Sequence, residues 1–330
     1  MVVLAIIIAL SLLYLFGPSP SKPIVNTILP SVPSDLHLLQ SQIADAESRI
    51  ALLKPDNQAR IIWADSAKKQ KTPFSVVYLH GLGGSQGDGL GIHTEFSRRY
   101  KCNVYLSRLY GHGIDSQDAL RDLTPENYLE SANRAVSIGK MLGDNVILMG
   151  TSTGAALALI IASHHPEIEG LILYSPNIDF NDNASFILTK PWGLYLARLF
   201  QGGKYINSDD HDSVRMYWNS KYRIEALISI KSLLSYEMNQ VTFSRIHQPV
   251  FVGYYYRNEA NQDNRVSVSR TLQMFEQIGT SPAFKRKIAF PNAGTHPIAS
   301  SVLSKDMNSV RNETFKFAEE IMKLVPTIMN

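Results

Sequence analysis

The sequence predicts an α/β fold in which a mostly parallel sheet is covered by helices on both faces. From residue 59 onward, short apolar runs rich in β-branched residues alternate with longer helical patterns. The runs are largely continuous rather than alternating, which is typical of strands buried on both sides. Gly, Asn or Pro closes most of them. The expected strands are residues 60–64, 75–80, 103–108, 145–149, 171–174, 250–256 and 286–290.

The clearest helical patterns lie between the later strands, at residues 125–142, 153–164, 266–278 and 305–324. Only a short connection joins the first two strands, so we expect them to form a hairpin at one edge of the sheet. About seventy residues, 178–247, carry aromatic and apolar groups but no clear strand. An insertion of this length in a compact domain is usually functional, and we expect a helical cap.

Length and composition limit the classes of function. The 330 residues correspond to roughly two average domains or one large α/β domain. The 45% apolar and 18% charged residues exclude a disordered chain. A net charge of +3 without a basic block argues against a nucleic-acid partner. The single cysteine, Cys102, excludes an internal disulfide and a multi-cysteine zinc site. We expect one catalytic domain at residues 59–330.

The N-terminal segment is unusually apolar, because residues 2–16 contain no charge. As a helix they would span about 22 Å, short of a hydrocarbon core of about 30 Å. Including Met1 and Gly17 brings the stretch to the lower limit of a spanning segment. No Lys or Arg precedes it and no A-x-A cleavage site follows. We therefore predict an uncleaved membrane anchor at residues 1–17 with an extracytoplasmic body; secretion after signal cleavage is the alternative.

Residues 18–58 connect this segment to the body. Prolines 18, 20, 23, 30 and 33 predict an extended linker. Ser34 or Asp35 can cap a following helix. Its apolar positions, from Leu36 to Leu53, have helical three-four spacing. We expect this amphipathic helix to pack on the body.

The strongest chemical signal is the sequence Gly-Thr-Ser-Thr-Gly at residues 150–154. It follows an apolar strand and opens a helix, which is the setting of a nucleophile elbow. A sharp turn exposes the serine hydroxyl, and the helix N-terminus offers N–H groups to a developing negative charge. The sequence therefore predicts Ser152 as a nucleophile.

A glycine-rich turn, His-Gly-Leu-Gly-Gly at residues 80–84, follows a central strand. Such a turn can aim a backbone N–H at the carbonyl of a substrate, so we assign the N–H groups of Leu82 and Thr153 to an oxyanion hole. A loop that merely turns tightly is the alternative. We expect His80 to support the turn. His112 precedes the serine in the chain and is interpreted as structural.

An acid and a histidine should follow the serine in that order. Asp263 lies after the sixth strand and just before a helix; Glu259 is the alternative acid and Asp179 a more distant third. Of the nine histidines, only His296 follows the last strand in the right place. His296 would take the proton of Ser152 while Asp263 fixes its tautomer.

These features in this order resemble the α/β-hydrolase superfamily over residues 59–325. The body looks most like the esterase and monoacylglycerol-lipase-like branch, which carries a helical cap in the same connection. It is also similar to bacterial membrane-associated hydrolases in which Lys-Pro-Asp-Asn, here residues 54–57, precedes the first strand. The resemblance implies the same Ser152, His296 and Asp263 roles. The acid loop is longer than the family's short turn.

We expect a serine hydrolase that cleaves carboxylic esters, such as monoacylglycerols, through an acyl-enzyme. A peptidase or acyltransferase would use the same three residues, and a non-catalytic ligand-binding protein would share the fold. No cofactor is expected, since the sequence contains no phosphate-binding glycine loop with Lys-Ser/Thr. Neither His80 nor His112 has neighbouring ligands suited to a metal.

Overall fold

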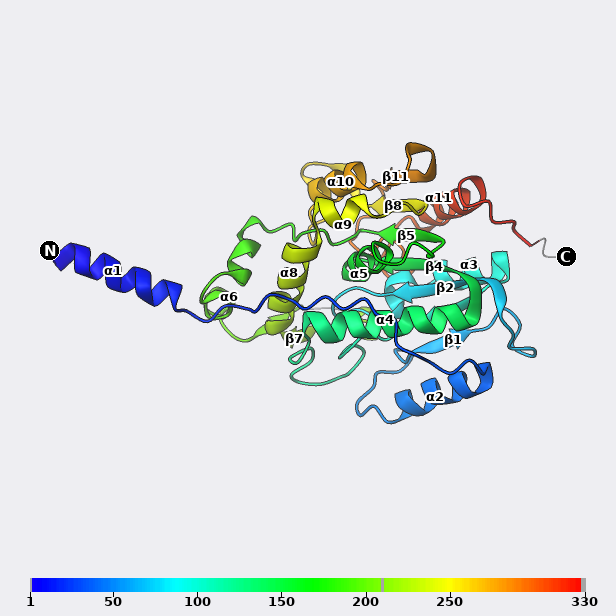
Figure 1. The fold of residues 1–330 in the computed structure, drawn as a ribbon, viewed down its shortest axis with the longest axis horizontal. Helices are drawn as coiled ribbons and strands as arrows, with labels where there is room; N and C mark the ends of the chain where they lie inside the picture. The colour runs from blue at the N-terminus through cyan, green and yellow to red at the C-terminus, as the bar shows by residue number, and fades with distance from the viewer. Residues whose placement is uncertain (1, 209–210, 328–330) are drawn as a thin grey trace.

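The computed structural model describes residues 2–208 and 211–327, with the side chain of Leu10 left out. A seven-stranded sheet forms the centre of the molecule, in the order β1-β3-β2-β4-β5-β8-β11 (Figure 1). Its strands are β1 (Arg60–Ile62), β2 (Thr72–Leu79), β3 (Asn103–Leu106), β4 (Gly143–Thr151), β5 (Gly170–Tyr174), β8 (Val250–Tyr254) and β11 (Lys285–Ala289). All seven coincide with predicted strands to within a few residues.

The pairing at one edge corrects the predicted hairpin. Strand β1 pairs antiparallel with β3, with Ile61 opposite Tyr105, and does not pair with β2. Both edges of β2 are occupied, by β3 on one side and β4 on the other, and both pairs are parallel. The short connection at 63–71 therefore carries the chain past β3 instead of turning it back on β1. All other neighbours in the sheet are parallel.

Helices cover both faces of the sheet. Consecutive residues of β2 point to opposite faces, so Val77 and Leu79 join one buried cluster and Val76 and Tyr78 join the other. The first cluster includes residues of α4, α5, α8 and α10, and the second includes residues of α3 and α11. The bounds are α3 (Ile92–Tyr100), α4 (Pro125–Leu142), α5 (Thr153–Ala162), α8 (Glu225–Glu237), α10 (Val268–Gln277) and α11 (Met307–Glu320), with short 3-10 helices η1 (Gln86–Gly89) and η3 (Pro282–Phe284).

The connection from β5 to β8 is mainly helical, as predicted. It holds η2 (Asn183–Thr189), α6 (Gly193–Gln201), α7 (Asp212–Arg215), α8 and α9 (Gln240–Ser244). The prediction missed two short strands, β6 (Tyr205–Asn207) and β7 (Lys221–Arg223), which pair antiparallel. Three residues per strand is too short for a periodic pattern to identify. Figure 1 shows α6 and β7 on the side of the molecule from which the N-terminal helix leaves.

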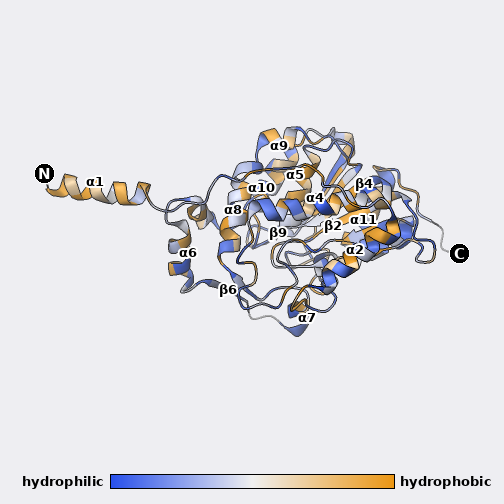
Figure 2. Ribbon diagram, turned by 60° about the horizontal axis from the view of Figure 1, so that its bottom comes forward, coloured by the Kyte–Doolittle hydropathy of each residue, from blue (hydrophilic) through white to orange (hydrophobic). Residues whose placement is uncertain are grey.

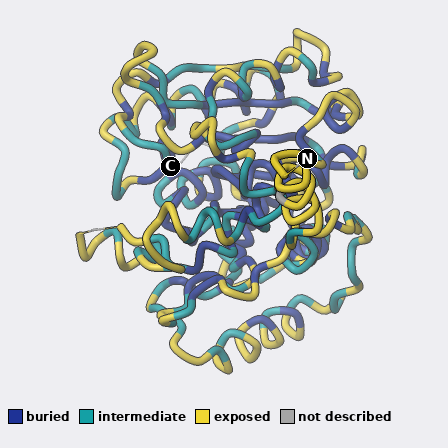
Figure 3. Tube along the Cα trace, turned by 90° about the vertical axis from the view of Figure 1, so that its left-hand side faces the viewer, coloured by how far each residue is buried: buried dark blue, intermediate teal, exposed yellow. Residues whose placement is uncertain are grey.

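The N-terminal helix α1 (Val2–Leu15) extends away from the body and exposes most of its apolar side chains (Figures 2 and 3). Its C-terminal end touches the β5–β8 connection, because Trp192 Nε1 donates to Leu13 O at 3.0 Å and Trp192 N donates to Pro18 O at 2.9 Å. Among the helices described, none is long and apolar enough to cross a membrane. The predicted transmembrane helix is therefore not confirmed.

The linker and helix α2 (Leu36–Ser48) pack on the body. Asp35 caps the helix by accepting from Leu38 N at 2.8 Å, and Leu39 and Ile43 are buried. Glu47 pairs with the Arg108 guanidinium through two hydrogen bonds, of 2.7 and 3.1 Å. These contacts confirm that the amphipathic helix packs on the sheet domain.

Candidate active site

Ser152 occupies the sharp turn between β4 and α5. Its backbone has φ 57° and ψ −122°, a left-handed conformation that costs a residue with a side chain about 1–3 kcal/mol. The flanking glycines explain why the turn can form. A Cβ on Gly154 would lie 2.1 Å from Leu79 O, and one on Gly150 would lie 2.9 Å from Ala155 N. The Gly-x-Ser-x-Gly spacing is thus a steric requirement of this turn.

Backbone hydrogen bonds fix the turn to the neighbouring strand end. Ser152 N donates to Tyr174 O at 2.9 Å, and Asn177 N donates to Ser152 O at 3.0 Å. The Ser152 residue is 8% exposed. In the described part of the chain its hydroxyl makes no hydrogen bond to His296. Such bonds are commonly long before substrate binds.

His296 and Asp263 form a direct pair. His296 Nδ1 lies 2.6 Å from Asp263 Oδ2. The other oxygen, Asp263 Oδ1, accepts from Arg265 N at 2.9 Å and Val266 N at 3.2 Å. Burial alone would raise the pKa of Asp263, but His296 and these N–H groups outweigh it and hold the pKa below its ordinary value. A carboxylate at Nδ1 makes that nitrogen the donor, which leaves Nε2 free to accept a proton.

The loop that carries His296 is tied to two central strands. Ser175 Oγ donates to His296 O at 2.7 Å. Ser175 N in turn donates to Gly253 O, also at 2.7 Å. Ser175 follows β5 directly, next to the strand end that holds Ser152 N. The histidine is therefore anchored to the same end of the sheet as the elbow.

The two alternative acids lie in other surroundings. Glu259 sits at the tip of a small hairpin, between β9 (Tyr256–Asn258) and β10 (Asn261–Gln262), and accepts from Tyr256 OH at 2.9 Å. The hairpin accounts for the extra length of the acid loop and carries Glu259 to an exposed position. Asp179 forms an ion pair with Lys231 of α8. Of the three candidates, the geometry joins only Asp263 to His296.

The glycine-rich turn leaves free N–H groups beside Ser152. In the described residues, the backbone N–H groups of Leu82 and Thr153 have no hydrogen-bond acceptor. Gly81 N, by contrast, donates to the carboxylate of Asp88 at 2.6 Å. A Cβ on Gly81 would lie 2.9 Å from Ser152 Cβ, so the turn passes directly over the serine. The arrangement suits the predicted oxyanion pair, Leu82 and Thr153.

The ring of His80 is hydrogen-bonded to this turn. Its Nε2 accepts from Leu109 N at 3.0 Å, so its Nδ1 carries the proton and donates to Gly81 O at 2.9 Å. Burial lowers the pKa of His80 to about 4, which keeps the ring neutral. His112 is also buried and stands edge-on to His80, with ring centres 4.8 Å apart. Both contacts agree with the structural roles predicted for these histidines.

Two residues near the site escaped the sequence reasoning. Ser175 is one, and Asp88 of η1 is the other. Asp88 is 2% exposed and contacts Gly81. Its only sequence signal was an isolated acidic residue within a run of small residues, Gly-Ser-Gln-Gly-Asp-Gly at positions 84–89.

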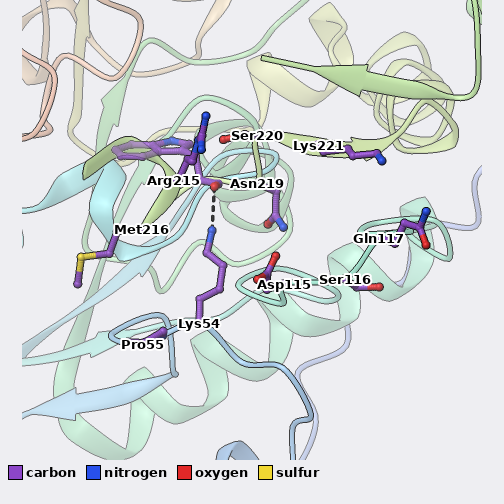
Figure 4. Close-up of a pocket in the computed structure, with 11 residues that line it drawn as sticks. Lys54, Pro55, Asp115, Ser116, Gln117, Arg215, Met216, Asn219, Ser220 and Lys221 are labelled. Atoms are coloured by element: carbon purple, nitrogen blue, oxygen red, sulfur yellow. Dashed lines mark hydrogen bonds between the residues drawn. The ribbon is translucent and has the colours of Figure 1, made fainter. Parts of the chain in front are cut away.

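A cavity of about 450 Å³ lies outside the turn (Figure 4). Lys54 enters it and donates to Trp218 O at 2.8 Å. Burial lowers the pKa of Lys54, partly offset by Asp115. Asn219, another lining residue, donates its N–H to Gly83 O at 2.7 Å, so this wall also supports the glycine-rich turn. Neither the serine nor the acid–histidine pair lines the cavity.

Across residues 2–208 and 211–327, no group of three or more His, Cys, Asp or Glu side chains is placed to hold a metal ion.

A family model described as the alpha/beta hydrolase family matches residues 76–298, about two thirds of the chain. The chain belongs to the alpha/beta hydrolase family. The matched region begins in β2 and ends just after the candidate histidine, so it includes the whole candidate site. The seven-stranded sheet is accordingly an α/β-hydrolase sheet with one antiparallel edge strand.

This hydrolase is similar to a thermostable monoacylglycerol lipase from Bacillus sp. (strain H-257), with 27% identity over 107 residues. That stretch covers 32% of this chain and less than half, 42%, of the lipase. Solved structures show the same fold. One for the metagenome-derived lipolytic enzymes LipS and LipT has a TM-score of 0.65 at 15% identity, covering 81% of this chain and 99% of that one. The monoglyceride lipase of Saccharomyces cerevisiae has a TM-score of 0.61 at 14% identity, covering 80% and 91%.

Proposed function

We propose that this hydrolase cleaves carboxylic esters, monoacylglycerols among them, through an acyl-enzyme on Ser152. The observation that carries the proposal is the strained elbow, which holds Ser152 against the glycine-rich turn at φ 57°. A serine in that conformation needs the two flanking glycines, and in the described part of the chain its hydroxyl makes no hydrogen bond that would give it a structural role. At the same end of the sheet, His296 can act as the base: its Nδ1 is bonded to Asp263, which orients the ring and leaves Nε2 free.

Each step uses a group that the site provides. His296 Nε2 takes the hydroxyl proton as Ser152 Oγ attacks the ester carbonyl carbon. The N–H groups of Leu82 and Thr153 stabilise the oxyanion of the tetrahedral intermediate. The intermediate collapses, the carbon–alkoxy bond breaks, and the leaving alcohol takes the proton from His296. Water then attacks the acyl-enzyme by the same route and releases the acid.

The choice of acyl esters rests on the relatives and on the β5–β8 connection. Proteins named monoacylglycerol lipases occur among both the curated relatives and the solved structures. In the connection, Leu199 and Phe200 of α6 are exposed. Exposed apolar side chains in this connection favour substrates with acyl chains.

We also propose that the body works outside the cytoplasm, attached through residues 1–17 or released after their removal. The support is the uncharged apolar helix α1, whose side chains are mostly exposed. Membrane flotation together with N-terminal sequencing of the mature chain tests this. Recovery of an intact N-terminus in the cytoplasmic fraction would contradict it.

The ester hydrolysis is tested with full-length protein and p-nitrophenyl butyrate. Ser152→Ala should lower turnover at least about 10³-fold, to the background that the remaining groups supply. Ser163→Ala is the matched control, since Ser163 is equally buried, at 8%, and its hydroxyl donates to Ile160 O at the end of α5. Retained turnover in Ser152→Ala would refute the mechanism.

A substrate panel separates the alternatives that share these three residues. Faster cleavage of amino-acid amides than of esters would make the protein a peptidase. Transfer to added alcohols at the expense of hydrolysis would make it an acyltransferase. Absence of all three reactions would favour a ligand-binding protein with the hydrolase fold.

A further inference from the structure

A buried carboxylate lies beneath the glycine-rich turn. Asp88 Oδ2 accepts from Gly81 N at 2.6 Å. In the described residues Asp88 Oδ1 has no partner within hydrogen-bond geometry, although the indole of Trp218 faces the carboxylate. No Lys or Arg pairs with Asp88 in the same part of the chain. An unpaired buried carboxylate is costly, and such groups occur mainly where they serve a site.

The turn is built around this carboxylate. A Cβ on Gly84 would lie 2.6 Å from Asp88 Oδ1, and one on Gly81 would lie 3.1 Å from Oδ2. The same Gly81 position lies 3.4 Å from Ser152 Oγ. The Asp88 carboxylate and the Ser152 hydroxyl therefore both lie close to the position where a Cβ of residue 81 would be. Asp88 is thus bonded to the residue of the turn that lies against Ser152.

Hydrogen bonds hold both peptide planes that meet at Gly81. Since Asp88 takes the Gly81 N–H, the next donor along the turn is Leu82 N–H, which has no acceptor among the described residues. The Gly81 N–H belongs to the peptide plane between residues 80 and 81, whereas the Leu82 N–H shares the plane between residues 81 and 82 with Gly81 O. Asp88 fixes the first plane through a short, charge-assisted bond, and His80 Nδ1 fixes the second by donating to Gly81 O at 2.9 Å, so that together they set the direction of Leu82 N–H.

We propose that Asp88 is a positioning residue of the active site, whose ionised carboxylate holds Gly81 so that Leu82 N–H points at the oxyanion. This inference rests on the proposed function. On this view the free energy lost by burying the Asp88 charge is offset by a better-ordered oxyanion hole. Such a hole is effective only when its donors are fixed before the reaction.

Two variants test the role with full-length protein. Asp88→Asn keeps an acceptor of nearly the same shape but weakens the bond, and Asp88→Ala removes it. We expect kcat for p-nitrophenyl butyrate to fall about tenfold in Asp88→Asn and further in Asp88→Ala, with KM within about twofold. Circular dichroism and melting curves verify that both variants fold.

The melting temperature separates positioning from simple support. Asp88→Asn removes a buried charge, so it should melt at a higher temperature than the wild type while turning over more slowly. A merely structural carboxylate would give lower stability and unchanged kcat per folded molecule. Asp56→Asn is the matched control, because Asp56 accepts from Gln86 Nε2 and Tyr217 OH but does not contact Gly81. It should leave kcat unchanged.

The outcomes distinguish the two proposals. An active wild type with unchanged or higher kcat in folded Asp88→Asn and Asp88→Ala overturns the inference and leaves the proposed function intact. A wild type that neither hydrolyses esters nor reacts with a fluorophosphonate overturns both. Slower fluorophosphonate labelling of Ser152 in both variants, in the same order as kcat, supports the positioning role.

Discussion

Two buried carboxylates near His296 differ in how they are satisfied. Asp263 meets a histidine and two backbone N–H groups, and these contacts hold its pKa below the ordinary value despite burial. Asp88 meets one backbone N–H, and burial raises its pKa to about 6, with His296 among the groups that offset the rise. The surroundings of Asp263 therefore favour its ionised form, whereas those of Asp88 disfavour it.

The difference separates two tasks in one site. A carboxylate that orients a histidine and stabilises its positive charge must stay ionised, so it needs several donors. A carboxylate that fixes a single peptide plane needs one short bond. The two energetically costly features, the charge on Asp88 and the backbone strain of Ser152, both lie in the candidate active site.

Among substitutions around the two carboxylates, the largest expected effect comes from breaking the Asp263–His296 pair. Asp263→Asn should lower kcat about 10⁴-fold, because an amide at Nδ1 favours the wrong histidine tautomer. Steady-state kinetics with p-nitrophenyl butyrate measures this. Glu259→Gln is the matched control at the hairpin tip and should stay within about twofold of the wild type. A severe loss in Glu259→Gln with an active Asp263→Asn would reverse the assignment of the acid.

A smaller effect is expected from crowding the turn between Asp88 and Ser152. In Gly81→Ala the new methyl group would lie 2.9 Å from Ser152 Cβ, so either the turn or the elbow must shift. We expect kcat to fall about 10²-fold, comparable to loss of one oxyanion donor. Gly203→Ala is the control, since nothing lies within 4 Å of its Cβ position. Normal kcat in Gly81→Ala would show that this close approach does not matter for the reaction.

Part of the site and of the fold can be predicted from the sequence. The elbow, the turn and the order of Ser152, Asp263 and His296 depend on local patterns at strand ends, and the structure brings these segments to one end of the sheet. The pairing of β1 with β3 depends on which edges of β2 are already occupied, which no local pattern reports. Asp88 escaped because its partner Gly81 is reached only through the fold of η1.

The smallest expected effect is a pH-dependent change in stability. The Asp88 carboxyl has a pKa of about 6 in the folded chain against an ordinary 3.8; its neighbours are His296, Trp218, Tyr78 and Tyr128. Between these pKa values the folded chain binds more protons than the unfolded chain. Stability attributable to Asp88 therefore falls as pH rises from about 4 to about 6 and stays lower above that.

Replacing the carboxyl with an amide should remove this dependence. At pH 8, Asp88→Asn should melt about 2–6 °C above the wild type, and at pH 4 the two should melt together. Differential scanning calorimetry at both pH values measures the difference. Equal melting temperatures at pH 8 would mean that the carboxylate carries no cost, and the contrast with Asp263 would disappear.

The most direct test of the account is covalent labelling of the folded, full-length chain with a fluorophosphonate, followed by peptide mass spectrometry. The reagent reacts with serines activated by a base and an oxyanion hole. We predict a single stoichiometric adduct on Ser152, absent in Ser152→Ala and strongly slowed in Asp263→Asn. No adduct, or an adduct on another serine, would contradict the assignment of Ser152 as the nucleophile of this hydrolase.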